Sequence, residues 1–166
     1  MKTKIHIKIR KKVKRTYDIG THGKRVDALM KTRGLISNLC FVEIKTHVTK
    51  LLDDSAYRVG CYSPSKELAG AVAQVQGTVA AAVENLSSKI NITDNSGNPT
   101  GEEIYNYQPK SFLVIGSLCE FDTSNGVNIE KLRSFELFRK NVVCPEIITF
   151  DELFDRAKYI TKNNEK

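Results

Sequence analysis

Long hydrophobic runs are absent from this sequence of 166 residues. No stretch approaches the roughly 18 consecutive apolar residues that span a bilayer. The basic start is not followed by the apolar region that a secretory signal requires. We therefore expect a cytoplasmic protein without a membrane partner. The sequence also lacks a G-x-S-x-G nucleophile elbow and a P-loop pattern, so acyl hydrolase and nucleoside triphosphatase functions have no support.

Cysteine is sparse, since the chain has only four, and they are widely spaced. No CxxC pair occurs, and no histidine lies at zinc-finger spacing from a cysteine. We therefore expect small buried hydrophobic side chains at these positions, rather than a zinc site or a disulfide framework. The four are Cys40, Cys61, Cys119 and Cys144.

Acidic residues are missing from the start of the chain. Residues 2–15 hold eight of the 26 Lys and Arg and no Asp or Glu, so the other 18 basic groups nearly balance 19 acidic ones. The formal charge of +7 thus describes a cationic leader on a near-neutral body, and it favours nucleic acid as the partner class. Ile5, Ile7 and Ile9 alternate with polar residues, which predicts a short strand. The basic run after it either tracks phosphates or forms a solvated face.

The first half of the chain predicts a hairpin followed by a long helix. Between Val26 and Lys45, two apolar runs are separated by a segment in which Gly34 and Asn38 fit a turn. Residues 51–63 are typical of a polar, irregular connection.

Pro64 then lies near the first turn of a helical pattern, with Ser63 as its expected cap. Apolar residues recur at helical spacing and predict one core-facing stripe, formed by Leu68, Val72, Val75, Val79, Val83 and Leu86. Small and polar residues occupy the other side of this helix: Gly70, Gln74, Gly77 and Ala81.

The second half predicts strands that alternate with helices. Residues 91–101 have the composition of a loop, residues 111–116 and 144–150 form short apolar runs typical of buried strands, and Asp151 is the expected cap of a last helix. The helical pattern at 128–140 is expected to face the core with Ile129, Leu132, Phe135 and Phe138. The last helix, which begins near Asp151, is expected to face the core with Leu153, Phe154 and Ala157. This order predicts an α/β fold with a mixed central sheet flanked by helices.

One strand carries an acid-x-lysine triplet. Because side chains alternate along a strand, Glu43 and Lys45 share one face, whereas Val42 and Ile44 are expected to face the core. Asp27, on the preceding strand of the hairpin, can come beside Glu43. Two carboxylates and a lysine at one sheet edge suit Mg²⁺-assisted phosphodiester hydrolysis. The alternative is a surface strand with a cross-strand ion pair, and the residues by themselves leave both interpretations open.

Several blocks of the sequence resemble, in order, the nuclease domain of Shedu bacterial antiphage defence proteins. The blocks are GKRVDALMKTRGLISNLCFVEIKTH, YRVGCYSPSKELAGAVAQVQGTV, PKSFLVIG and SFELFRKNVVCPEIITFDELFDRAKYI. The resemblance covers about residues 21–160, and that family belongs to the PD-(D/E)xK nuclease superfamily. It implies a restriction-endonuclease-like fold. Residues 1–20 do not resemble the family, so we expect a leader there and a nuclease domain at residues 21–166.

The resemblance implies a role for each motif residue. Asp27 and Glu43 would be metal ligands, with the backbone carbonyl of Ile44 as a third, and Lys45 would be the catalytic lysine. Gln74 matches the helix glutamine of the superfamily and would position water or a backbone phosphate. The implied cofactor is Mg²⁺, with Mn²⁺ as a substitute and no small-molecule cofactor.

The function that follows is a Mg²⁺-dependent DNA endonuclease of antiphage defence. Its partner would be double-stranded DNA, with Arg25 and His47 placed next to the motif to contact phosphates. The resemblance also implies a homo-oligomer, a dimer or a tetramer. The alternative is a DNA-binding or oligomerisation module that keeps the nuclease fold without catalysis.

Overall fold

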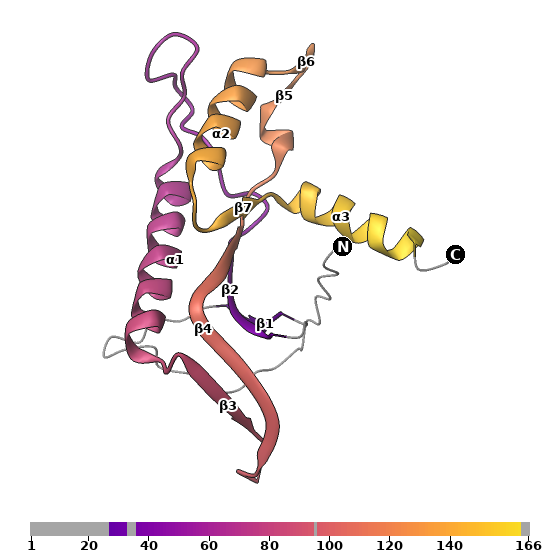
Figure 1. The fold of residues 1–166 in the computed structure, drawn as a ribbon. Helices are drawn as coiled ribbons and strands as arrows, with labels where there is room; N and C mark the ends of the chain where they lie inside the picture. The colour runs from indigo at the N-terminus through magenta and orange to yellow at the C-terminus, as the bar shows by residue number, and fades with distance from the viewer. Residues whose placement is uncertain (1–26, 33–35, 95, 164–166) are drawn as a thin grey trace. The chain divides into compact units, whose positions relative to one another are not determined.

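The computed structural model describes residues 27–32, 36–94 and 96–163 (Figure 1). The strand expected around Ile5–Ile9, the basic leader, Gly34 and Arg25 lie outside these residues. None of the described helices has the length and hydropathy needed to cross a bilayer.

The structure confirms a mixed α/β fold with a central mixed sheet flanked by helices. The strand order is β1-β2-β4-β3, with β7 also paired to β4. β1 with β2 and β3 with β4 are antiparallel pairs, whereas β7 pairs with β4 in parallel. A separate pair, β5 with β6, forms a small second sheet. The elements are β1 (Ala28–Lys31), β2 (Asn38–Ile44), α1 (Lys66–Asn85), β3 (Lys89–Thr93), β4 (Pro99–Val114), η1 (Leu118–Phe121), β5 (Asp122–Thr123), β6 (Gly126–Val127), α2 (Ile129–Asn141), β7 (Glu146–Ile148) and α3 (Phe150–Asn163).

The chain divides into two compact units, each assembled from two stretches of sequence. The first unit comprises residues up to Val42 together with Val75–Ser111, and the second comprises Glu43–Gln74 together with residues from Phe112 onward. Strands β2 and β4 and helix α1 each contribute a segment to both units.

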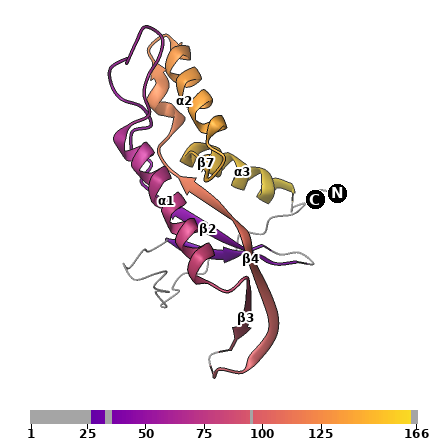
Figure 2. The same cartoon turned by 60° about the vertical axis from the view of Figure 1, so that its left-hand side comes forward.

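The first unit contains two antiparallel hairpins. The predicted hairpin is confirmed, with Ala28 opposite Val42, although Asn38 begins β2 instead of lying in the turn. The second hairpin, β3 with β4, can be followed in Figure 2 and was expected to be a loop. The expected loop at 91–101 is wrong at both ends, which belong to β3 and β4, and the ladder between them shifts register between Asn91 and Thr93. The turn between the strands is held by the Asp94 carboxylate, which accepts the backbone N–H groups of Ser96 and Asn98. The core of this unit is formed by Leu39, Phe41, Ala82 and Ile104.

The second unit has the larger core. The connection expected at 51–63 is not uniformly polar, since Leu51 and Leu52 are fully buried. Their backbone N–H groups both donate to the Glu120 carboxylate. These two buried donors would otherwise lack a hydrogen-bond acceptor. The buried residues of this core are Leu51, Leu52, Leu68, Ala71, Val72, Leu113, Ile115, Phe121, Phe135 and Ile147.

Helix α1 begins two residues later than Ser63 would place it. The cap is Ser65, whose hydroxyl accepts the Leu68 N–H at 3.0 Å and donates to the Lys50 carbonyl at 2.6 Å. The predicted stripe is confirmed at Leu68, Val72 and Val75 but is wrong at Val83, which is exposed. The buried positions toward the end of the helix are instead Thr78 and Ala82.

The predicted helix at 128–140 and the strand at 144–150 are confirmed as α2 and β7. Phe135 is fully buried, whereas Ile129, expected in the core, is exposed. Strand β4 extends far beyond the predicted 111–116, and Leu113 pairs with Ile147 of β7. The prediction of four buried cysteines is wrong for two of them: Cys40 is buried, Cys144 is half-buried, and Cys61 and Cys119 are exposed, all as free thiols.

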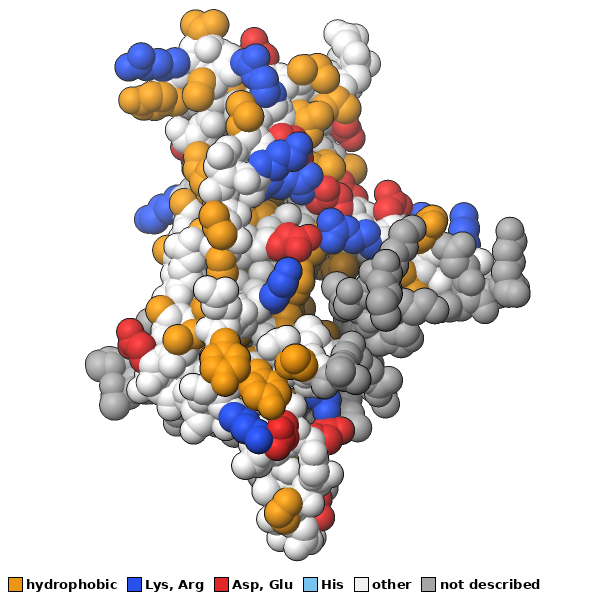
Figure 3. Space-filling model, in the orientation of Figure 1, with side chains coloured by type: hydrophobic (Ala, Val, Ile, Leu, Met, Phe, Trp, Pro, Cys, Tyr) orange, Lys and Arg blue, Asp and Glu red, His pale blue; other side chains and the backbone are white. Residues whose placement is uncertain are grey.

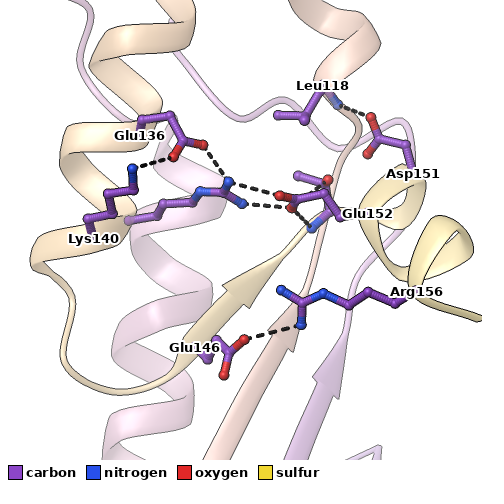
Figure 4. Close-up of polar contacts among 9 residues, drawn as sticks. Leu118, Glu136, Lys140, Glu146, Asp151, Glu152 and Arg156 are labelled. Atoms are coloured by element: carbon purple, nitrogen blue, oxygen red, sulfur yellow. Dashed lines mark hydrogen bonds and ion pairs between the residues drawn. The ribbon is translucent and has the colours of Figure 1, made fainter. Parts of the chain in front are cut away.

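The last helix, α3, starts with a different cap from the one predicted. Thr149 is the cap, and its backbone N–H and its hydroxyl both donate to Glu152, three residues on. Asp151 instead accepts the backbone N–H of Leu118 at 2.9 Å (Figure 4). Phe154 and Ala157, predicted to face the core, are exposed.

An ion-pair network joins α2 to the start of α3. Arg139 contacts Glu152 through two hydrogen bonds of 2.6 and 2.8 Å and also pairs with Glu136. Figure 4 shows Glu136 and Glu152 on opposite sides of the guanidinium group that bonds to both. Partial burial acts to raise the pKa of the Glu152 carboxyl, but the hydrogen bonds from Arg139 and Thr149 outweigh it and lower the pKa from 4.5 to about 2.

Glu152→Gln should therefore destabilise the protein in a pH-dependent way. A carboxyl whose pKa is lowered by folding stabilises the folded state above its unfolded pKa, and this contribution is lost as the pH falls from about 4.5 to about 2. We expect a loss of up to about 3 kcal/mol in unfolding free energy at pH 6, shrinking below pH 4.5. Urea unfolding at several pH values measures it, with Glu146→Gln of the exposed Glu146–Arg156 pair as the control. Equal stability of Glu152→Gln and the parent at pH 6 would refute this account.

Gly116 forms a turn that only glycine can occupy. Its φ is +62°, and an added Cβ would lie 2.6 Å from Leu51 Cδ2 and 2.7 Å from the Thr49 carbonyl oxygen. Its N–H donates to the Thr46 carbonyl, and its own carbonyl accepts from Phe150, so the turn ties three segments together.

Gly116→Ala should lower the unfolding free energy by about 2 to 5 kcal/mol, because backbone strain and overlap with Thr49 and Leu51 add. Gly70→Ala in α1 is the matched control. A Cβ at Gly70 meets nothing within 4 Å, so this change should stabilise by about 0.5 to 1 kcal/mol. Thermal or denaturant unfolding of both variants tests the pair, and a neutral Gly116→Ala would contradict the packing described here.

Candidate active site

Glu43 lies near the end of β2 and is buried, with 6% of its surface exposed. It shares a strand face with Leu39 and Phe41, which are also buried, whereas Ile44 on the opposite face is 48% exposed. The prediction that Val42 and Ile44 face the core is therefore wrong for Ile44, and Val42 is only half-buried. Both faces of β2 are buried at Leu39–Phe41, but toward the end of the strand the face that carries the acid is the more buried one.

Two side chains donate hydrogen bonds to the carboxylate of Glu43. Lys45 Nζ donates to Glu43 Oε1 at 2.8 Å, and Gln74 Nε2 donates to the same oxygen at 2.9 Å. Lys45 Nζ also donates to Gln74 Oε1 at 3.1 Å, which closes a triangle of hydrogen bonds. We call Glu43, Lys45 and Gln74 the polar triangle.

The backbone around the triangle is fixed by the core of the second unit. The Lys45 N–H donates to the Val114 carbonyl at 2.9 Å, which attaches the residues after β2 to β4. Gln74 comes from α1, two residues after buried Val72 and on the side away from the apolar stripe. Each side chain of the triangle therefore projects from backbone that is held in place by buried residues nearby, a condition for a preorganised site.

The triangle resolves an electrostatic problem. A buried carboxylate is costly unless a charge and hydrogen bonds compensate it, and Lys45 with Gln74 supplies both. Both bonds end on Oε1, so Glu43 Oε2 takes part in neither. The arrangement therefore holds the Lys45 ammonium and the Gln74 amide beside Glu43 Oε2, an oxygen to which neither of these two groups donates.

The donors available for a metal are hard oxygens. Among residues 27–32, 36–94 and 96–163, no group of three or more His, Cys, Asp and Glu side chains could hold a metal ion. This excludes a cage built only from such side chains within those residues. Glu43 Oε2 and the carbonyl of Ile44 suit Mg²⁺, which keeps several waters and takes few protein ligands.

The other predicted site residues are not joined to the polar triangle by any hydrogen bond described above. Asp27 lies in the bend directly before β1 with an exposed side chain, and it belongs to the first unit, so its part in a site with Glu43 stays a prediction. His47 is exposed, and its ring meets Phe150 edge-on, with the ring centroids 6.2 Å apart. Arg25 lies outside the described residues, so its proposed phosphate contact also stays a prediction.

Sequence reasoning did not identify the residues that support the triangle. The Val114 carbonyl, which fixes the Lys45 backbone, and Gly116, which turns the chain after β4, were not recognised. A signal for Gly116 exists, since a glycine that directly follows a buried apolar run often marks a left-handed turn. No local signal marks the Val114 contact, because it joins residues 69 positions apart along the sequence.

Comparison with known proteins places the chain in one family. The family described as "Shedu protein SduA, C-terminal" matches residues 2–154, a range that includes most of the basic leader. The chain is 35% identical over 141 residues to the Shedu protein SduA of Bacillus cereus (strain B4264). The aligned region covers 84% of this chain and 35% of that relative, so the chain spans about a third of the relative's length.

Removing Lys45 should destabilise the protein through Glu43. Lys45→Met leaves the buried carboxylate with a single partner of the triangle, and we expect a loss of about 1 to 3 kcal/mol in unfolding free energy. Adding Glu43→Gln to Lys45→Met removes the uncompensated charge and should recover much of that loss. Lys50→Met is the control, because its pair with Asp54 is exposed and should matter little. Additive effects of the two site changes in a double-mutant cycle would show that the residues do not interact.

Proposed function

The chain belongs to the Shedu SduA family by its match to the C-terminal region of that protein, and on this premise we propose a Mg²⁺-dependent DNA endonuclease of antiphage defence. The observation that carries the proposal is the polar triangle. A buried acid, a lysine two residues later and directly after the end of the strand, and a glutamine from the following helix converge within hydrogen-bonding distance. A surface ion pair needs neither the burial of Glu43 nor the glutamine.

The proposed reaction is hydrolysis of a phosphodiester bond. A water oxygen forms a bond to phosphorus, the bond from phosphorus to the leaving oxygen breaks, and the leaving oxygen takes up a proton. Bound Mg²⁺ would polarise the phosphoryl oxygen and lower the pKa of a coordinated water. Glu43 through Oε2 and the carbonyl of Ile44 would hold the ion.

Lys45 and Gln74 would act on the attacking water and on the phosphate. Lys45 Nζ carries a positive charge beside the carboxylate, where it can orient water and stabilise the negative charge that develops on the phosphoryl oxygens. Gln74 offers both an amide donor and an acceptor, so it can hold Lys45 and Glu43 in place and align a water or a backbone phosphate. To act on water or phosphate, Lys45 or Gln74 would only need to replace one hydrogen bond within the triangle by a hydrogen bond to the substrate.

We retain Asp27 as the second carboxylate ligand of the proposed metal site. It is the residue before Ala28, whose ladder partner Val42 directly precedes Glu43. Arg25 and His47 keep their proposed part as phosphate contacts, since each lies close in sequence to a motif residue.

Double-stranded DNA is the proposed substrate. The support is the charge of +7, of which the basic groups of residues 2–15 form the concentrated part. On the face drawn in Figure 3, the described Lys and Arg side chains are interspersed with Asp and Glu and form no single basic field. Most non-specific DNA affinity is therefore expected from the basic leader.

A second candidate function is a DNA-binding or oligomerisation module that keeps the fold without catalysis. The observation that favours it is the pairing of Glu43 itself, since Lys45 and Gln74 already compensate the buried carboxylate. In that case the triangle serves stability alone. The two functions differ in whether Mg²⁺ binds at Glu43 and whether DNA is cut.

Cleavage of linear and circular duplex DNA tests the proposal. The purified chain with MgCl₂ should convert circular DNA to nicked or linear forms, and EDTA should stop it. We expect Glu43→Gln to abolish cleavage and Lys45→Met to slow it by about 10³-fold or more, because ligand binding and charge stabilisation are lost. Lys50→Met and Glu103→Gln, both changes in exposed ion pairs, should cut at the parental rate.

A binding measurement separates the two candidate functions. Millimolar MgCl₂ should raise the melting temperature of the parent and of Lys45→Met but not of Glu43→Gln, because only a ligand of the folded state stabilises it. If DNA binds but is not cut, and Mg²⁺ leaves the melting temperature unchanged, the binding module is the correct function. Cleavage by Glu43→Gln at the parental rate would show that the site lies elsewhere.

A further inference from the structure

A narrow hairpin lies in the second unit between β2 and α1, the two elements that position the polar triangle. At its base the Asp53 N–H donates to the Ser63 carbonyl at 3.0 Å, and at its end the Cys61 N–H donates to the Arg58 carbonyl at 2.9 Å. In Figures 1 and 2 this connection extends beyond the N-terminal end of α1. We call residues 53–63 the finger.

The end of the finger is a fixed turn. Gly60 has a φ of +68°, a left-handed conformation that suits glycine. Helix α2 holds the strand that follows, since Arg133 donates to the Gly60 carbonyl at 3.1 Å and the Tyr62 N–H donates to Ser134 Oγ at 3.1 Å. Side chains on the turn therefore project from backbone that is already ordered, so a partner that binds them pays little ordering entropy.

Three consecutive side chains at this end are exposed. Val59 is fully exposed, Tyr57 is 71% exposed, and Arg58 between them is exposed as well. The Arg58 guanidinium lies over the Tyr57 ring, 5.7 Å from its centroid. One exposed valine is ordinary on a protein surface, but an apolar, a cationic and an aromatic group on one fixed turn form a contact surface.

The charge at the end of the finger is positive. Its acids, Asp53 and Asp54, follow one another at the base, and Asp54 pairs with Lys50. On the side of α2, the Lys131 ammonium lies 5.3 Å from the Tyr62 ring centroid. Arg58 is therefore the only charged group of the turn itself, and its positive sign suits a polyanion.

We propose that the end of the finger enters the major groove of the duplex DNA that the polar triangle cuts. The major groove is about 12 Å wide and admits a hairpin of two chain segments. Val59 lies against base edges there, where the thymine methyl is an apolar partner, and Arg58 binds a phosphate at the rim of the groove. The inference takes its substrate, DNA, from the proposed function but does not depend on catalysis.

The shape of the contact surface favours a groove over a protein partner. Protein interfaces are built on broad patches, of about 800 Å² on each partner, with an apolar centre. The finger instead presents one fully exposed apolar side chain at its end, with a cation beside it. A projection of this kind reaches the floor of a groove that a broad surface cannot enter.

The position of the finger sets what it can do. Gln74 lies nine residues after the Ser65 cap, or about 13 Å along α1, and the finger extends by about another 13 Å. Its end is therefore about 25 Å from the triangle, which corresponds to about seven base pairs of duplex. The finger touches no reacting atom, so it contributes to DNA affinity and leaves the maximal cleavage rate unchanged.

Fluorescence anisotropy with a labelled 30-base-pair duplex in EDTA tests the contact. Val59→Asp and Arg58→Gln should each weaken binding by about fivefold or more, because a carboxylate meets phosphates or a phosphate contact is lost. Arg58→Gln should also reduce the slope of affinity against salt by about one. The matched controls are Val143→Asp, at a valine that is 99% exposed, and Arg156→Gln, in an exposed ion pair, and both should bind like the parent.

Measurement in EDTA keeps this proposal separate from the nuclease. Glu43→Gln should bind DNA with parental affinity while failing to cut it, so a loss of cleavage tests the triangle and a loss of affinity tests the finger. Circular dichroism of each variant checks that the fold is kept. Affinities of Val59→Asp and Arg58→Gln equal to those of their controls would overturn the finger and leave the nuclease proposal standing.

A change in the DNA tests the groove. Replacing thymine by uracil in a duplex of A·T pairs removes the methyl groups from the major groove and leaves the phosphates in place. The parent should bind the uracil duplex about twofold more weakly, whereas Val59→Ala should bind both duplexes equally. Equal loss in the parent and in Val59→Ala would show that Val59 does not read the major groove.

Discussion

The hydrogen bonds that compensate the buried carboxylate of Glu43 are the interaction on which the candidate site depends. Lys45 and Gln74 both reach one oxygen of this group, at 2.8 and 2.9 Å. A carboxylate on the core-facing side of a strand is costly without such partners, so β2 ends in this way only because a lysine and a helix glutamine accompany the acid. The same demand for compensation keeps the three polar side chains of the triangle together, and the proposed function rests on this arrangement.

The supporting structure is a set of anchors that hold short segments against the core of the second unit. The Ser65 hydroxyl ties the start of α1 to the Lys50 carbonyl, and the Gly116 turn joins the segment after Lys45 to the start of α3. Farther along, the contact of Arg139 with Glu152 joins α2 to α3. Each anchor satisfies backbone or charged groups that burial would leave unpaired, so stability and the placement of the site depend on the same contacts.

Several elements followed from the sequence because their signals are local. The hairpin, the long helix that bears Gln74, and the segment of α2 around Phe135 each show a clear period and are confirmed. The helix caps were predicted less accurately: Ser65 caps α1 where Ser63 was expected, and Thr149 caps α3 where Asp151 was expected. Neighbouring polar residues can all cap a helix, and which of them does so depends on where the preceding segment is attached, as Ser65 shows through its bond to Lys50.

The sequence by itself determined that Glu43 and Lys45 share a strand face, that α3 is amphipathic, and that the ordered blocks resemble the Shedu family, because alternation, helical spacing and motif order are properties of the chain alone. Only the tertiary structure decided that the face with Glu43 is the more buried one, that Gln74 reaches it across 31 positions of sequence, and that part of the α3 face predicted to pack inward stays exposed. The physical reason is that a local period specifies which side chains lie together on a face. What covers that face depends on contacts between distant segments, and these follow from the packing of the whole unit.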